Sequence, residues 1–473
     1  MSVFYKFICA FLHKYTIQSY WRNNVFFGCF SVKKTLVSFP LYTVDLTKFG
    51  VAVKQWGCLE IHMGANFNLK TLTVALAALS TASMASAAGL DRSGQDITAF
   101  LQDGLYAEAV YTYLDADVSG HDNAYVGADK NAYQQGNKID DIAESYDFFR
   151  YGVKADINDT FSVGVLYDEP FGAAADYSGD NKFVDTKGEG TKVEVRTENI
   201  TGILGVKFGE NKEFQVYGGP VAQRVQADVK LRGTAYQAAN GYTTHITADQ
   251  DYGWLAGVAY SKPEIALQAA LTYRSEIDHT LGLSEVFPAI AGAIPAAATG
   301  VNGEIDITTP KSVNFDFQTG INPTTLATAK VRWVPWSDFE IVPPLYNQGS
   351  KLDSSNGPDG LSLVSYDKDQ WLVELGLAKR LTPALAVTGN IGWDSGAGNP
   401  VTSLGPIEGY YSAGLGAKYN LTDNWAISAG GKYLWYGDAK GQIPNKFAVS
   451  NFEDNDGFAV GVKLSYQAKQ DFN

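Results

Sequence analysis

The chain has 473 residues, a formal net charge of −14 and three cysteines. Its acidic balance argues against nucleic acid or an anionic phospholipid surface as a partner. No stretch after residue 87 offers about 18 consecutive apolar residues, which excludes a transmembrane helix there. Because Cys9, Cys29 and Cys58 all precede residue 63, the chain beyond that point must gain its stability from packing and backbone hydrogen bonds, without disulfides.

An export signal is predicted at an internal position, residues 63–87. The segment runs from a methionine through one basic residue and an apolar stretch to Ala85-Ser86-Ala87, an A-x-A cleavage pattern. Such signals act at the amino terminus, so Met63 is the expected start of translation. Residues 1–62 are then expected to be an upstream extension wrongly included in the gene. The mature protein would begin at residue 88 or 89, outside the cytoplasm.

Period-two alternation of apolar and polar residues dominates the chain after residue 105. In the last such run, Phe458, Val460 and Val462 share one face, while Ala459 and Lys463 share the other. This pattern indicates strands with one face in an apolar medium. The predicted strands are 106–114, 146–157, 161–167, 192–208, 214–230, 251–260, 265–279, 304–317, 326–339, 370–380, 385–393, 409–419, 425–438 and 456–468.

The connections alternate between short turns, such as 158–159 and 209–213, and long polar loops, such as 168–191 and 280–303. Transmembrane barrels place tight turns on the periplasmic side and long loops outside, whereas a soluble sandwich has no reason to alternate so regularly. The even strand number also suits a closed barrel. The predicted fold is therefore all-β, a single 14-stranded antiparallel transmembrane β-barrel over residues 106–473.

Aromatic residues lie near opposite ends of several predicted strands. The pairs are Trp254 with Tyr260, Tyr410 with Tyr419, and Trp425 with Trp435. Amphipathic rings prefer the headgroup level of a bilayer, so these residues are expected to form two girdles. The alternative is that aromatic residues simply favour strands.

Several stretches resemble the FadL-type long-chain fatty-acid transport porins. They are Ala88-Gly-Leu-Asp-Arg-Ser-Gly-Gln95, Tyr167-Asp-Glu-Pro-Phe-Gly172, Ala270-Leu-Thr-Tyr-Arg-Ser-Glu276, Thr309-Pro310 and Trp336-Ser-Asp-Phe339. The similarity runs from about residue 88 to 468. The order and spacing of these motifs make the resemblance more specific than any one of them.

The resemblance implies a passive transporter in the outer membrane of a Gram-negative bacterium, a barrel closed by an amino-terminal hatch at 88–105. Its cargo would be a hydrophobic small molecule such as a long-chain fatty acid. The cargo would be captured at an apolar extracellular groove, held in a lumenal pocket and released sideways at a kinked third strand. Outer-membrane lipid and the barrel-assembly machinery would be its partners. A monomer is expected, with no cofactor or metal.

Two features depart from the family's pattern. Its Asn-Pro-Ala hatch motif is absent, since residues 96–105 read DITAFLQDGL, so the hatch is expected to be shorter or differently built. The chain also ends on Phe472-Asn473 rather than on an aromatic residue.

The strongest candidate site is the long loop around residues 283–294. Apolar residues recur there at three- and four-residue steps, which predicts a short helix with one apolar stripe. The stripe consists of Leu283, Val286, Phe287, Ile290 and Ile294. An extracellular apolar stripe needs a partner, so it is expected to be a landing groove for alkyl chains. The alternative is that it packs on the loop at 231–250 and seals the barrel mouth.

The hatch supplies a second apolar face, formed by Ile97, Phe100, Leu101 and Leu105. A plug in a polar lumen would ordinarily present polar groups, so this face could line the ligand pocket. The alternative is packing against an apolar patch of the lumen.

The third strand ends in Tyr167-Asp-Glu-Pro-Phe-Gly172. Pro170 cannot donate to the ladder and Gly172 relaxes the backbone, so pairing should lapse there. Tyr167, Pro170, Phe171 and Gly172 are therefore candidates for a lateral gate. The alternative is an ordinary strand end.

A carboxylate headgroup would need a lumenal cation. By strand parity Arg274, Lys330 and Arg332 face inward and are the candidates, although most lumenal cations simply balance acidic neighbours. No G-x-S-x-G, H-E-x-x-H or phosphate-binding loop predicts catalysis. A general diffusion porin, which would leave the apolar hatch unexplained, an outer-membrane lipid hydrolase and a soluble periplasmic β protein are the competing hypotheses.

Overall fold

The computed structural model describes residues 26–32, 35–41 and 90–469. The chain divides into two units, Met1–Ala65 and Asn66–Asn473. In the first unit, β1 (Phe26–Val32) and β2 (Thr35–Leu41) form an antiparallel pair. The predicted signal peptide and mature start lie outside the described residues and stay predictions.

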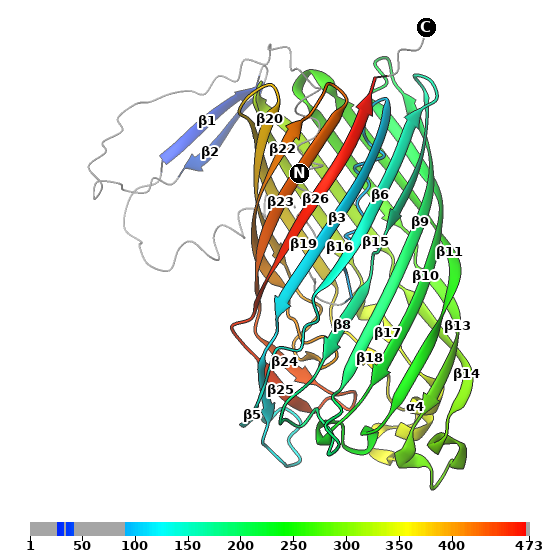
Figure 1. Cartoon of the computed structure of the whole chain (residues 1–473). Coiled ribbons are helices and arrows are strands. Elements are labelled where there is room, and N and C mark those ends of the chain that lie inside the picture. Colours follow the sequence, from blue (N-terminus) through cyan, green and yellow to red (C-terminus); the bar gives the residue numbers. More distant parts are fainter. Residues whose placement is uncertain (1–25, 33–34, 42–89, 470–473) are drawn as a thin grey trace. The chain divides into compact units, whose positions relative to one another are not determined.

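Within residues 90–469, fourteen antiparallel strands close into a barrel, which confirms the predicted fold class (Figure 1). Three of the fourteen are interrupted and carry two labels each. The uninterrupted strands are β3 (Leu105–Asp117), β6 (Tyr146–Asp156), β9 (Lys192–Phe208), β10 (Phe214–Lys230), β11 (Thr243–Lys262), β16 (Thr325–Val334), β19 (Gln370–Arg380), β20 (Leu385–Asp394), β22 (Tyr410–Asn420), β23 (Trp425–Tyr436) and β26 (Asp456–Ala468). The interrupted ones are β7 (Phe161–Asp168) with β8 (Gly172–Asp176), β12 (Leu267–Arg274) with β13 (Ile277–Val286), and β14 (Val301–Thr309) with β15 (Ser312–Asn322).

Side chains alternate across the wall as the sequence predicts. On β26, Phe458 and Val462 are exposed on the outer face, whereas Ala459 and Lys463 are buried inside. A lipid-facing apolar band and a polar or small-residue lumen require this alternation.

The girdle prediction holds for most of its residues. Trp254, Tyr419, Trp425 and Trp435 are all exposed on the outer face. Tyr410 is an exception, because it begins β22 with its side chain buried in the interior. Its assignment to a girdle is therefore wrong.

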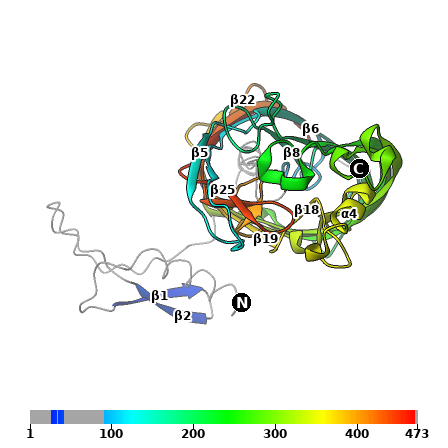
Figure 2. The same cartoon turned by 90° about the horizontal axis from the view of Figure 1, so that it is seen from below.

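The long loops cover one end of the barrel. β4 (Gly120–Asn123), β5 (Gln135–Ile139), β21 (Val401–Thr402), β24 (Ala439–Gln442) and β25 (Ala448–Phe452) form a separate five-stranded sheet. A second small pair joins β17 (Glu340–Ile341) to β18 (Val364–Ser365). Seen along the barrel, β25, β18 and helix α4 (Pro344–Ser350) lie over the opening (Figure 2). These segments are loops in the sequence prediction because their strands are too short to show a period.

The helices of the described residues are short. In the described part of the chain, no helix is both long enough and apolar enough to cross a bilayer. Within residues 90–469, the helices other than α4 are 3₁₀ turns: η2 (Thr234–Ala239), η3 (Pro263–Ile265), η4 (Pro288–Ile290), η5 (Pro295–Ala298), η6 (Trp336–Asp338) and η7 (Ser354–Asn356).

Two sequence expectations fail near the long-loop end. β11 begins at Thr243 rather than residue 251, because β10 and β11 continue as a hairpin down to the pair Lys230 and Thr243. The helix predicted over 283–294 is wrong, since β13 extends to Val286 and the chain then forms only the turns η4 and η5. Pro288 would lie in the interior of the predicted helix, where proline lacks the N–H for the helical hydrogen bond and its ring clashes with the preceding turn, so the helix cannot run through it.

Candidate functional site

The hatch is anchored in the lumen by buried polar contacts at its amino-terminal end. The guanidinium of Arg332 on β16 donates to both carboxylate oxygens of Asp91, at 2.7 and 2.8 Å. Arg332 also donates to Gln95 Oε1 at 3.1 Å, and Asn314 Nδ2 donates to the Gly94 carbonyl at 2.8 Å. Arg–carboxylate pairs of this geometry are directional and strong. They fix the register of the hatch against the wall.

The three headgroup candidates face the lumen, as parity predicts, and all are buried there. Each contacts the hatch: Arg332 pairs with Asp91, Lys330 Nζ lies 3.7 Å from Asp96 Oδ2, and Arg274 Nη2 donates to the Gln95 carbonyl at 3.5 Å. Their charges therefore hold the plug in place while it is seated. A headgroup role for them stays a prediction and would require the hatch to move.

The apolar face of the hatch is fully enclosed. Ile97 and Phe100 are both 0% exposed and belong to an apolar cluster with wall residues. The Phe100 ring lies 5.6 Å from the ring of Tyr217 on β10. A Cβ added at Gly164 would lie 2.7 Å from the Phe100 ring, so the wall glycine makes room for it. In this structure the apolar face of the hatch therefore packs against an apolar patch of the lumen, which is the alternative that the sequence analysis left open.

The other two residues of that predicted face have different positions. Leu101 is buried and joins the same cluster. Leu105 is the first residue of β3, pairs with Ala468 of β26 and so belongs to the wall rather than to the hatch. The prediction that Leu105 belongs to the hatch is therefore wrong.

The third strand breaks where Pro170 and Gly172 predict a lapse. β6 pairs with β7 only from Tyr151 onward, and β8 pairs with β9 on its other side. In the described chain, the main-chain N–H of Phe149 reaches across this gap to the Glu169 side chain, at 3.3 Å. The wall between β6 and β8 is therefore locally open at the level of the backbone.

The hatch backbone closes this gap from inside. Asp91 and Phe171 form an antiparallel bridge. The Arg92 N–H donates to the Pro170 carbonyl and the Gly172 N–H donates to the Leu90 carbonyl, both at 2.7 Å. Residues 90–92 thus act as a short extra strand that satisfies the backbone groups freed by the break.

Arg92 fills the gap itself. Its guanidinium carbon lies 3.9 Å from the centroid of the Tyr146 ring on β6. A Cβ at Gly172 would lie 2.4 Å from the same guanidinium, so glycine is required there for this contact. Tyr167 lies on the outer face, with its ring 5.8 Å from that of Tyr151. Phe171 instead points inward, edge-on to Trp336 at 5.5 Å.

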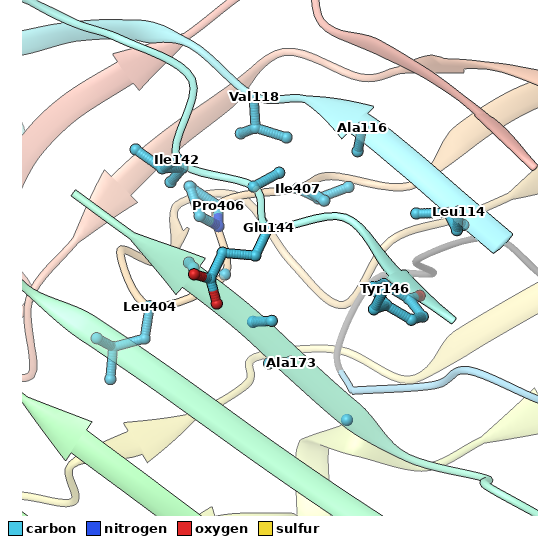
Figure 3. Close-up of a pocket in the computed structure, with 15 residues that line it drawn as sticks. Leu114, Ala116, Val118, Ile142, Glu144, Tyr146, Ala173, Leu404, Pro406 and Ile407 are labelled. Atoms are coloured by element: carbon cyan, nitrogen blue, oxygen red, sulfur yellow. The ribbon is translucent and has the colours of Figure 1, made fainter. Parts of the chain in front are cut away.

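A small apolar pocket of about 50 Å³ lies beside the interruption (Figure 3). Its lining includes Leu114, Ala116, Val118, Ile142, Tyr146, Ala173, Ala174, Ala175, Leu404, Pro406 and Ile407. β3 and the segment before β6 supply one side, β8 supplies the wall, and the loop between β20 and β22 reaches in from the lumen. Glu144 also lines it.

The loop stripe is covered in this structure. Leu283 lies in β13, and the ring of Phe287 packs against Tyr242 at 5.3 Å and Tyr346 of α4 at 5.9 Å. Phe287 and Ile290 are buried, whereas Val286 and Ile294 are partly buried. The arrangement matches the sealing alternative, although the partner includes α4 as well as the loop at 231–250.

A buried carboxylate fastens this seal. Glu285 accepts hydrogen bonds from the Tyr242 hydroxyl at 2.8 Å and from the main-chain N–H groups of Leu345 and Tyr346 at 2.9 and 3.0 Å. Burial and the nearby carboxylate raise the pKa of Tyr242, so its hydroxyl keeps the proton that it donates. Release of the stripe would require these bonds to break.

Two functional candidates are absent from the sequence prediction. Arg92 lies in a stretch that resembles the family, but nothing in its local pattern shows that it contacts a strand more than 50 residues away. The segment 404–407 is a short apolar stretch that contains Gly405 and Pro406, a signal that also fits an ordinary surface turn. Only the closed barrel brings either segment to the gap.

Comparison with known proteins identifies the family and the fold to which this chain is similar. The family model described as outer membrane protein transport protein (OMPP1/FadL/TodX) matches residues 96–472. A FadL homologue from Pseudomonas aeruginosa is similar with a TM-score of 0.62 and 16% identity, over 82% of this chain and 97% of that one. The toluene transporter TodX from Pseudomonas putida gives a TM-score of 0.51 at 10% identity, over 82% and 97% of the two chains.

These identities are low, so the structural likeness establishes the fold alone. No curated protein matches the sequence. The family model, in contrast, spans most of the chain and all of the barrel up to residue 468. The chain therefore belongs to the OMPP1/FadL/TodX family of outer-membrane transport proteins.

Proposed function

We propose that this protein passively carries long-chain fatty acids or similar hydrophobic compounds across the outer membrane and releases them sideways into the bilayer. One observation carries the proposal: residues 90–92 of the hatch complete the wall at the broken third strand. A hatch that leaves its seat would therefore open the lumen and the wall together. The cargo would leave through an apolar gap without crossing water.

Capture is proposed at the stripe Leu283, Val286, Phe287, Ile290 and Ile294. Tyr346 of α4 covers Phe287 in the present state, so α4 would have to move before an alkyl chain could bind. The lumenal pocket would then form around Ile97, Phe100 and Leu101, whose contacts with the wall a hydrocarbon could replace. These roles are proposals that rest on burial and position.

The contacts of the lumenal cations bear on which part of the cargo is recognised first. All three lumenal cations proposed for a headgroup contact the hatch, and two of them pair with its carboxylates. Recognition before the hatch moves would therefore depend on the hydrocarbon body. A fatty acid, an alkane and an aromatic hydrocarbon all provide such a body, and they differ in whether a freed Arg332 or Lys330 gives added affinity.

The test is uptake by cells with an intact outer membrane that express the full chain. We expect labelled oleate, hexadecane or toluene to enter faster than in cells without the protein, and a small hydrophilic sugar to show no gain. Mass spectrometry of ligands bound to the detergent-purified protein should identify the same compound class. Sugar flux equal to hydrocarbon flux would favour a diffusion porin instead. Release of free fatty acid from phospholipid, abolished by a serine or histidine substitution, would favour a hydrolase.

A further inference from the structure

We propose that the loop between β20 and β22, residues 395–409, is the inner gate of the lateral exit, and that Leu404 and Ile407 select cargo by its width. The inference rests on the proposed function, because it assigns a selecting element to the exit described there. It concerns the pocket of about 50 Å³ beside the broken third strand (Figure 3).

The two sides of this pocket differ in bulk. On the wall side, β8 contributes Gly172 and three successive alanines, Ala173–Ala175, so the wall is thin. On the lumen side, the loop contributes the larger Leu404, Pro406 and Ile407. Of these two sides, the loop is therefore the bulkier one.

The pocket is too small for cargo in this state. A dry protein cavity of about 150 Å³ accommodates benzene, three times the volume present here. β8 is held on both sides, by β9 along its length and by the bridge between Ala143 and Ala175. The loop is fastened as far as Ser403, whose N–H donates to the Gln442 carbonyl at 3.0 Å and whose carbonyl accepts from the Tyr177 hydroxyl at 2.6 Å. The part that can yield is therefore the segment 404–407.

The attachments of the loop support such a movement. In the described chain, main-chain hydrogen bonds of residues 404–407 stay within the loop, from Gly405 N–H to the Thr402 carbonyl and from Ile407 N–H to the Gly405 carbonyl. Leu404 is held by burial in the apolar core, and Ile407 packs against that core. Apolar contacts are non-directional, so a hydrocarbon in the pocket can replace them.

Glycines with left-handed backbone conformations flank the segment. Gly398 has φ +122° and Gly409 has φ +58°. A Cβ at Gly409 would lie 2.3 Å from the Asp394 carbonyl oxygen, so this position excludes other residues. The loop thus joins the rigid ends of β20 and β22 through points where only glycine avoids strain.

The residues that line the pocket also determine which part of the cargo it can contact. Among the described residues that line the pocket there is no lysine or arginine, and Glu144 supplies a carboxylate. The pocket lining therefore contacts the uncharged hydrocarbon body and distinguishes cargo by shape, whereas Arg92 of the hatch, stacked on Tyr146 in the gap, is a cation beside the pocket.

The experiment compares two ten-carbon hydrocarbons, linear n-decane and bicyclic decalin, in uptake by cells that express the full chain. Leu404→Ala should raise the ratio of decalin to n-decane uptake about tenfold, the lower range of what one methylene difference achieves in an apolar pocket. Ile407→Phe should lower the ratio. Leu363→Ala, which truncates a buried leucine that does not line the pocket, is the matched control and should leave the ratio unchanged.

Heat-modifiable migration in gels shows that each variant barrel is assembled. Assembled Leu404→Ala and Ile407→Phe variants with the wild-type ratio would overturn the inference, as would an equal shift in Leu363→Ala. If the wild-type protein admits neither hydrocarbon faster than cells without it, the proposed function itself fails. The two failures are therefore distinguishable.

Discussion

Arg332 on β16 and Asp91 in the hatch form a buried two-point ion pair, with N–O distances of 2.7 and 2.8 Å. The pair lies one residue from Arg92, which fills the gap in the third strand. Seating of the hatch and closure of the wall are therefore the same event at this end of the segment.

Arg332→Gln is expected to loosen the hatch without disrupting the barrel. Removal of one partner leaves the Asp91 charge buried and uncompensated, at a cost of about 3–5 kcal/mol. Hydrogen exchange of residues 90–104 should become faster, while exchange in β26 stays slow. The double variant Asp91→Asn/Arg332→Gln removes the stranded charge and should recover part of the protection. Equal protection of the hatch in Arg332→Gln and wild type would contradict this role.

Gly164→Leu should unseat the apolar half of the hatch. Its Cβ alone would lie 2.7 Å from the Phe100 ring, so Phe100 must leave its site. The expected result is faster proteolysis within residues 90–104 of the folded barrel. Gly202→Leu is the matched control, because the nearest atom to its Cβ is 4.0 Å away, in the side chain of Pro220. The same cleavage rate in Gly164→Leu and Gly202→Leu would show that Phe100 does not hold the hatch.

Phe287→Asp combined with Ile290→Asp tests the capture stripe. Each buried CH₂ is worth about 0.8 kcal/mol, so loss of an alkyl contact there should weaken ligand binding by several kcal/mol. The barrel should still assemble, because Phe287 and Ile290 lie beyond the last residue of β13, Val286. Val126→Asp, at a loop residue that is 90% exposed, is the control. Normal uptake by the assembled double variant would reduce the stripe to a seal.

An acid-sensitive contact is expected in the long loop around Glu189. Hydrogen bonds from Arg232 and Lys230 lower the pKa of Glu189 from 4.5 to about 2. Because the folded pKa is depressed, the contribution to loop stability is complete above about pH 4.5 and is lost as the pH falls toward 2. Exchange of residues 182–191 should therefore rise, relative to the barrel strands, between pH 5 and pH 2.5. Glu189→Gln should remove this dependence, and an unchanged profile in that variant would assign the effect to another group.

The wall of the barrel could be predicted from the sequence because one physical signal governs it. Strands between lipid and lumen alternate at every second residue, and runs such as Phe458 to Leu464 show this directly. The inward direction of Arg332 follows from the same period, whereas the break was predictable from the missing N–H of Pro170.

The contacts that join distant segments could not be predicted in this way. The pairing of Asp91 with Arg332, and of Phe287 with Tyr346, depends on how the closed barrel places loops and hatch. The helix predicted over 283–294 failed because Leu283 and Val286 are spaced for one helical face but belong to a strand. In such a short segment both periods fit the same residues.

Lateral release is the central claim, and a reversible link across the gap tests it most directly. Phe149 and Glu169 face each other there, with 3.3 Å between the main-chain nitrogen and the carboxylate. Cysteines would replace both in a chain that has no other cysteine after residue 58, linked directly or by a short thiol-reactive spacer, with each single-cysteine variant as a control. Hydrocarbon uptake should stop when the pair is linked and return on reduction, while ligand binding to the purified protein stays constant. Equal uptake in the linked and reduced states would contradict lateral release and favour a path past the hatch into the polar pocket of about 180 Å³ lined by Leu101 and Lys207.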